Sequence, residues 1–192
     1  GKRANRRRSD QEFGLNENLA REILELHTLG VDGGYTQKDV TSFAKVISGW
    51  SMGGATDRGL LADGRPGTFE FREIMHEPGA QRVLGTRFSQ KGVDQGEAVL
   101  RDLATHPATA RFVSFKLARH FVADEPPVAL VDRMTDAWLD SGGDLPTVYK
   151  VLIRSEESWQ ANRQKYKTPH DFVISTLRAF NHKPDRPQFI VG

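Results

Sequence analysis

Residues Leu15 to Trp50 read LNENLAREILELHTLGVDGGYTQKDVTSFAKVISGW, the pattern of two amphipathic helices joined by a glycine turn. Apolar residues recur every three or four positions in both halves, which places them on one face of each helix. Gly33 and Gly34 separate the halves and can adopt the positive φ angles of a tight turn. Thr36 is followed three residues later by Asp39, so we expect a capping box at the start of the second helix. We therefore expect a helix pair against which the rest of the chain packs.

Helical spacing also covers most of the chain after residue 93. The segment 107–122 carries apolar residues on most of its circumference, so we expect it to be the buried central helix. Residues 68–74 instead alternate apolar and polar side chains, as a short strand does, and 81–88 could supply its return strand. The predicted fold class is mainly α: a multi-helix orthogonal or antiparallel bundle with a small β-ribbon near 68–88 and a long glycine-rich loop at 51–67.

The charge distribution favours a basic tail on a slightly acidic body. The 192 residues carry a net charge of +2, but the first eight residues include five lysines and arginines. We expect a basic irregular tail at 1–14, a single helical domain at 15–182 and a C-terminal extension at 183–192 that ends at a truncation. The tail could contact nucleic acid or anionic lipid. The composition of the body argues against nucleic acid as the partner.

Several classes of site are excluded by what the sequence lacks. The chain has no cysteine, which excludes disulfides and thiolate metal sites. It contains no apolar run of 18 residues, so we expect no membrane span. The glycines of 51–67 lack the lysine and hydroxyl of a phosphate-binding loop, and no HExxH motif occurs. The turn at 28–39 has Thr28 and Gly30 at the first and third places of a calcium loop, where oxygen-rich ligands are needed. We therefore assign no cofactor.

Six side chains carry chemistry that an enzyme could use, in two groups. Glu22 and Glu25 are three residues apart and share a helix face. Beside His27, they could bind a divalent ion or move protons. The second group lies near the bend of the predicted ribbon, next to the glycine-rich loop. For both groups the simpler interpretation is structural, as salt-bridged surface or as histidine bonded to a carbonyl. The six candidates are Glu22, Glu25, His27, Arg72, His76 and Glu77.

Longer blocks of the sequence resemble a known family. NENLAREILELHTLGVDGGYTQKDV at 16–40, followed by ISGW, is similar to the bacterial family catalogued as domain of unknown function 1800. FREIMHEPGAQRVLG at 71–85 and HPATARFVSFKLARHFVADEPP at 106–127 fit the same pattern, and the likeness covers about 15–180. Family members are usually longer at both ends and are often made with an export signal. The resemblance therefore implies a truncated chain, a periplasmic or exported location and no particular reaction.

Two functions remain open at this point. The first is a structural or interaction module of an exported bacterial protein. Because some members are encoded beside a second exported protein, a protein of the same export system would be its partner. The alternative is a metal-dependent or acid/base hydrolase that uses the six candidates, with its site completed by parts of a longer chain. The sequence leaves the oligomeric state undetermined.

Overall fold

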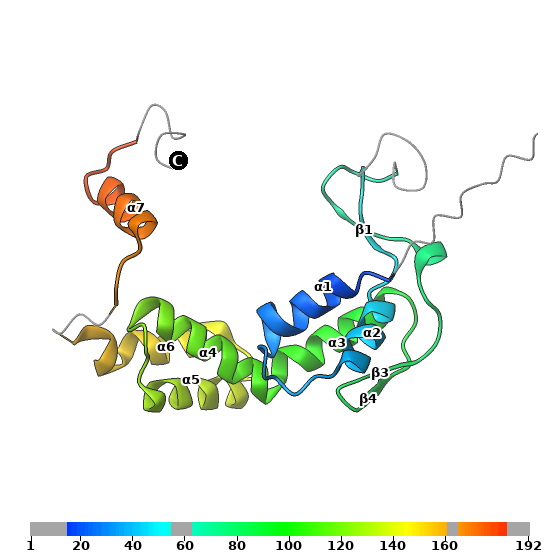
Figure 1. The fold of residues 1–192 in the computed structure, drawn as a ribbon, viewed down its shortest axis with the longest axis horizontal. Coiled ribbons are helices and arrows are strands. Elements are labelled where there is room, and N and C mark those ends of the chain that lie inside the picture. The colour runs from blue at the N-terminus through cyan, green and yellow to red at the C-terminus, as the bar shows by residue number, and fades with distance from the viewer. Residues whose placement is uncertain (1–14, 55–62, 161–164, 184–192) are drawn as a thin grey trace, which may run out of the picture. The chain divides into compact units, whose positions relative to one another are not determined.

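The computed structural model describes residues 15–54, 63–160 and 165–183 (Figure 1). Its contacts divide the chain into two compact units, residues 1–112 and 113–192, and each is described here by itself. The expected tail at 1–14 and all but the first residue of the extension at 183–192 lie outside the described residues. The expected single domain over 15–182 stays a prediction.

The described residues form seven α-helices and two small antiparallel sheets, which confirms the prediction of a mainly α protein. No helix among them is long and apolar enough to cross a membrane. Unit 1 contains α1 (Glu17–Glu22), the π-helical turn η1 (Ile23–Thr28), α2 (Gln37–Val46), β1 (Trp50–Met52), β2 (Phe69–Phe71), the 3-10 turn η2 (Glu73–Met75), β3 (Gln81–Val83), β4 (Thr86–Phe88) and α3 (Val93–Thr105).

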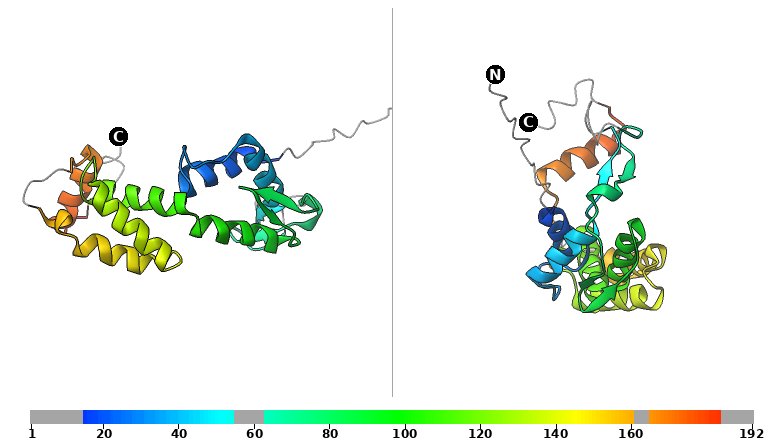
Figure 2. Two further views of the ribbon diagram at one scale, coloured as in Figure 1. Left: turned by 90° about the horizontal axis from the view of Figure 1, so that it is seen from below. Right: turned by 90° about the vertical axis from the view of Figure 1, so that its right-hand side faces the viewer.

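The predicted helix pair is present and builds the core of unit 1. Thr36 Oγ accepts a hydrogen bond from the Asp39 N–H, and Asp39 Oδ2 accepts one of 2.8 Å from the Thr36 N–H, so the capping box is confirmed. Helices α1 and α2 pack against each other, and β3 packs against α2 (Figure 2). Leu24, Phe43 and Leu103 are fully buried between these elements, with α3 closing the core.

The pairing of the strands differs from the prediction. Segment 68–74 does not pair with 81–88: β2 pairs with β1, and β3 pairs with β4 in a separate sheet. The reason is the two-residue turn at Leu84 and Gly85, whose φ angles of 49° and 80° suit a tight hairpin. That hairpin uses up 81–88, so β2 pairs with the strand at the start of the glycine-rich segment. Residues 55–62 of that segment lie outside the described part.

Unit 2 has its own core. It contains the C-terminal part of α4 (Pro107–Phe121), then α5 (Val128–Asp140), α6 (Leu145–Arg154), the 3-10 turn η3 (Glu156–Trp159) and α7 (Pro169–Ala179). Helices α5 and α6 pack against each other. They bury Leu130, Met134 and Val148 completely.

Helix α4 is not the fully buried central helix that its composition predicts. Its buried side chains include the small residues Ala110, Ser114 and Ala118, spaced four apart, whereas Phe115 and Phe121 are exposed. The fully buried stripe of α4 thus carries small side chains. Phe115 and Phe121 therefore lie on open faces, whereas Phe112, Val113 and Leu117 are half-buried.

Candidate functional site

The first group of predicted site residues lies along α1 and η1. Glu22 and His27 are exposed. The hydroxyl of Tyr35 donates a hydrogen bond of 3.0 Å to Glu25 Oε2. Burial, reinforced by this bond and by the charge of Glu25, raises the pKa of Tyr35 above its ordinary value. Glu25 thus serves as an acceptor that ties η1 to the turn before α2.

The second group, which comprises Arg72, His76 and Glu77, is held by hydrogen bonds to the residues that follow α2. The backbone N–H of Glu77 donates a hydrogen bond of 2.7 Å to Ser48 Oγ. The N–H of Arg72 donates one of 2.8 Å to the carbonyl of Gly49. Gly49 has a φ of +83°, and a Cβ at this position would collide with the Arg72 carbonyl. Only glycine therefore allows the segment 72–77 to approach α2 so closely.

His76 has one ring nitrogen held by the backbone. Its Nδ1 lies 2.9 Å from the carbonyl oxygen of Ser48, and because a carbonyl only accepts, Nδ1 carries the proton. In neutral His76, Nε2 is then the acceptor and base. His76 lines a cavity of about 290 Å³ together with Glu73, Ser89 and Lys91. The arrangement could move a proton to or from a small molecule.

The described residues show no direct bond between the two groups. No hydrogen bond or ion pair there joins Glu22, Glu25 or His27 to Arg72, His76 or Glu77. Within the same ranges, no cluster of three or more His, Asp or Glu side chains could hold a metal ion. A site that uses all six candidates therefore stays a prediction.

Sequence reasoning missed an apolar groove in unit 2. The hollow has a volume of about 580 Å³. Much of its lining is exposed: 62% of Phe121, 59% of Ile153 and 74% of Trp159. The indole N–H of Trp159 on η3 donates a hydrogen bond of 2.6 Å to the carbonyl of Ile153, which ties the ring to α6. The groove residues are Leu117, Phe121, Tyr149, Leu152, Ile153, Ser158 and Trp159.

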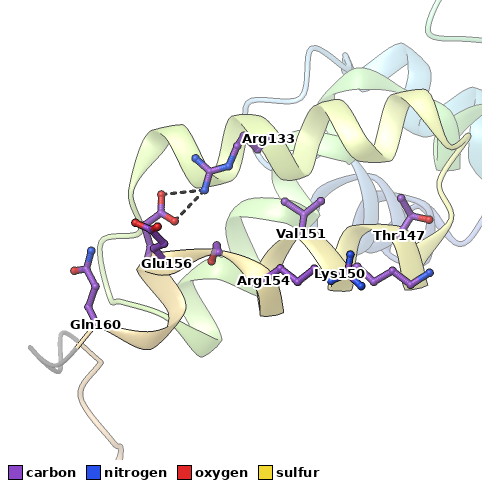
Figure 3. Close-up of a pocket in the computed structure, with 9 residues that line it drawn as sticks. Arg133, Thr147, Lys150, Val151, Arg154, Glu156 and Gln160 are labelled. Atoms are coloured by element: carbon purple, nitrogen blue, oxygen red, sulfur yellow. Dashed lines mark hydrogen bonds and ion pairs between the residues drawn. The ribbon is translucent and has the colours of Figure 1, made fainter.

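A polar hollow of about 810 Å³ lies along the same helix, α6. Arg133 on α5 donates two hydrogen bonds of 2.9 Å to the carboxylate of Glu157 on η3 (Figure 3). The backbone N–H of Glu157 and the Arg133 guanidinium hold the pKa of this carboxyl below its usual value. Lys150 and Arg154 line the hollow, and neither makes an ion pair with any described residue.

One signal in the sequence could have revealed the groove. Helix α6 buries Val148 and Leu152, which are four residues apart, and exposes Tyr149 and Ile153, which have the same spacing. It therefore carries two adjacent apolar stripes, and a helix against a single core needs only one. The second stripe, followed by an aromatic residue at Trp159, indicates a surface for something else.

Comparison with known proteins gives a family but no described relative. The model of the family described as "Protein of unknown function (DUF1800)" matches residues 2–190, so the chain belongs to this family. The match confirms the resemblance read from 15–180. No curated protein and no solved structure matches the chain.

Proposed function

We propose that this DUF1800 chain is a protein-interaction module of an exported bacterial protein. The observation that supports the proposal is the exposed apolar groove on unit 2, where Phe121, Ile153 and Trp159 remain largely accessible. Export, and a partner from the same export system, are part of the proposal because of the family resemblance.

The groove has the properties of a binding surface rather than of ordinary apolar exposure. Isolated apolar residues are common on protein surfaces, but contiguous apolar patches mark interaction sites. Burying a large apolar side chain contributes roughly 1.5–3 kcal/mol, so covering several of them favours association. Tryptophan is enriched among the residues that dominate binding energy. The hydrogen bond from Trp159 to Ile153 holds the ring in place before a partner arrives.

Selection from a library of helical peptides tests the interaction module. We expect enriched peptides to bind the wild-type chain and to lose about 30-fold or more in affinity with Trp159→Ala, because hot-spot truncation costs at least about 2 kcal/mol. Val31→Ala is the matched control, since Val31 is 68% exposed in unit 1. Selected peptides whose affinity responds to Val31 and not to Trp159 would contradict the proposal, as would the absence of any enriched peptide.

A second candidate is acid–base chemistry at His76, favoured by the Nδ1 hydrogen bond that leaves Nε2 as a base beside a cavity. A panel of small ester and phosphoester substrates tests it. We expect any turnover to fall by about 100-fold or more with His76→Ala. His27→Ala is the control because His27 is exposed on η1. Turnover that survives His76→Ala would remove this candidate.

A further inference from the structure

The two helices that wall the groove carry charge of one sign. Helix α4 has the sequence PATARFVSFKLARHF and α6 the sequence LPTVYKVLIR, and neither contains aspartate or glutamate. On α6, Lys150 follows the groove residue Tyr149, and Arg154 follows the groove residue Ile153. Both cations are exposed and without an ion pair in the described ranges. The long wall of the groove is therefore apolar with a basic border.

Most acidic groups beside these helices are already engaged. Asp124, just after α4, accepts hydrogen bonds from Lys165 and from the Tyr166 N–H. Asp144 caps α6 through Thr147. Glu157 binds Arg133, so Glu156, on the rim of the polar hollow, is the acid on η3 without such a bond. The charge of Lys150 also helps to lower the pKa of Asp144, but no described carboxylate forms an ion pair with Lys150 or Arg154.

From this charge pattern we propose that the groove binds an acidic amphipathic helix of a partner protein. The inference rests on the proposed function and names the partner's chemistry. Anchors spaced three and four residues apart on one face of such a helix would fill an apolar groove between helices. Aspartate or glutamate beside the anchors would face Lys150 and Arg154. Opposite charges at the rim increase the association rate and the selectivity for the partner, while the apolar anchors supply most of the affinity.

Two designed peptides test the charge of the partner. Both have the same apolar face and matched helicity, but one carries glutamate and the other lysine at the flanking positions. Fluorescence anisotropy of the labelled peptides, at low and high salt, gives their affinities for the full chain. We expect the acidic peptide to bind about tenfold more tightly at low salt, and the advantage to shrink at high salt because rim charges are screened.

Charge reversal on the protein completes the experiment. The variant Lys150→Glu with Arg154→Glu should lose the preference for the acidic peptide. Arg87→Glu, an exposed arginine on β4, should keep it. If both peptides bind equally and both depend on Trp159, the inference about charge is wrong and the interaction module stands. If neither peptide binds, the acidic helix is overturned, and the library selection decides the interaction module separately.

Binding to anionic lipid vesicles is the last measurement, since a basic apolar surface could also bind a membrane. A blue shift of the Trp159 emission with these vesicles, absent in Trp159→Phe and without binding of the acidic peptide, would overturn the proposal in favour of a lipid surface. We expect the acidic peptide, and not the vesicles, to shift that emission.

Discussion

Gly96 shows how a missing side chain fixes the packing of unit 1. It lies in the first turn of α3 and is buried, and a Cβ there would overlap the indole ring of Trp50. Alanine is the better helix former by about 1 kcal/mol. We nevertheless expect Gly96→Ala to lower the free energy of unfolding of unit 1 by about 1–3 kcal/mol, because overpacking forces the ring or the helix to move. Urea unfolding followed by NMR signals of unit 1 measures the change.

A second substitution, at Trp50, tests whether contact with its ring causes the loss of stability. Trp50→Leu removes the part of the ring that meets the new methyl group, so the double variant should lose less than the two single losses added together. Gly96→Ala with unchanged or higher stability would show that Trp50 moves aside at no cost.

At the scale of elements, Asp39 joins α2 to the β3–β4 hairpin. Its Oδ2 accepts hydrogen bonds from the N–H and hydroxyl of Thr36, and its Oδ1 accepts one of 2.8 Å from the N–H of Leu84. Burial raises the pKa of Asp39, but these hydrogen bonds outweigh it, so the pKa lies below its ordinary value of 3.8. The carboxylate is therefore the form that stabilises this junction.

The lowered pKa sets the pH dependence of the junction. A group whose pKa is lower in the folded state contributes its full stability above the unfolded pKa, and loses it as the pH falls through the folded pKa. We expect Asp39→Asn to cost about 0.5–2 kcal/mol at neutral pH, the range for loss of a helix cap. This difference in the free energy of unfolding should shrink as the pH falls below 3.8, the ordinary pKa of the carboxyl. Urea unfolding at several pH values, followed by NMR signals of α2, measures it. A difference that is constant down to the acid limit would contradict the role of the carboxylate.

These elements also show which parts of the fold the sequence could predict. The capping box at Thr36 and the spacing of α1 and α2 depend on residues a few positions apart, and both were predicted correctly. The pairing of Trp50 with Phe71 joins distant residues, and no local pattern distinguishes it from a hairpin within 68–88. Likewise, side-chain spacing shows that α4 and α6 are apolar, but it does not show which apolar stripe a neighbour covers. The second apolar stripe of α6 could indicate a binding surface, but the lining of the groove became visible only with the helices in place.

At the scale of the molecule, the buried residues fall into two sets. The cluster around Leu24, Phe43 and Leu103 lies wholly within unit 1. Leu130, Met134 and Val148 are buried in unit 2. Each unit thus has buried apolar side chains of its own, as a separate domain does. Helix α4 runs through the boundary and is the covalent path along which one unit could affect the other.

If the two cores are separate, each unit should unfold locally without the other. Phe43→Ala removes a fully buried ring and should cost unit 1 about 3–5 kcal/mol. Native-state hydrogen exchange should then show faster exchange for amides of α2 and α3, while amides of α5 keep their wild-type protection, because local regions open with their own free energies. Met134→Ala is the reciprocal variant, which should affect α5 and leave α2 unchanged. Equal loss of protection in both units for either variant would mean that they unfold as one cooperative body, and that the single domain expected over 15–182 is the better description.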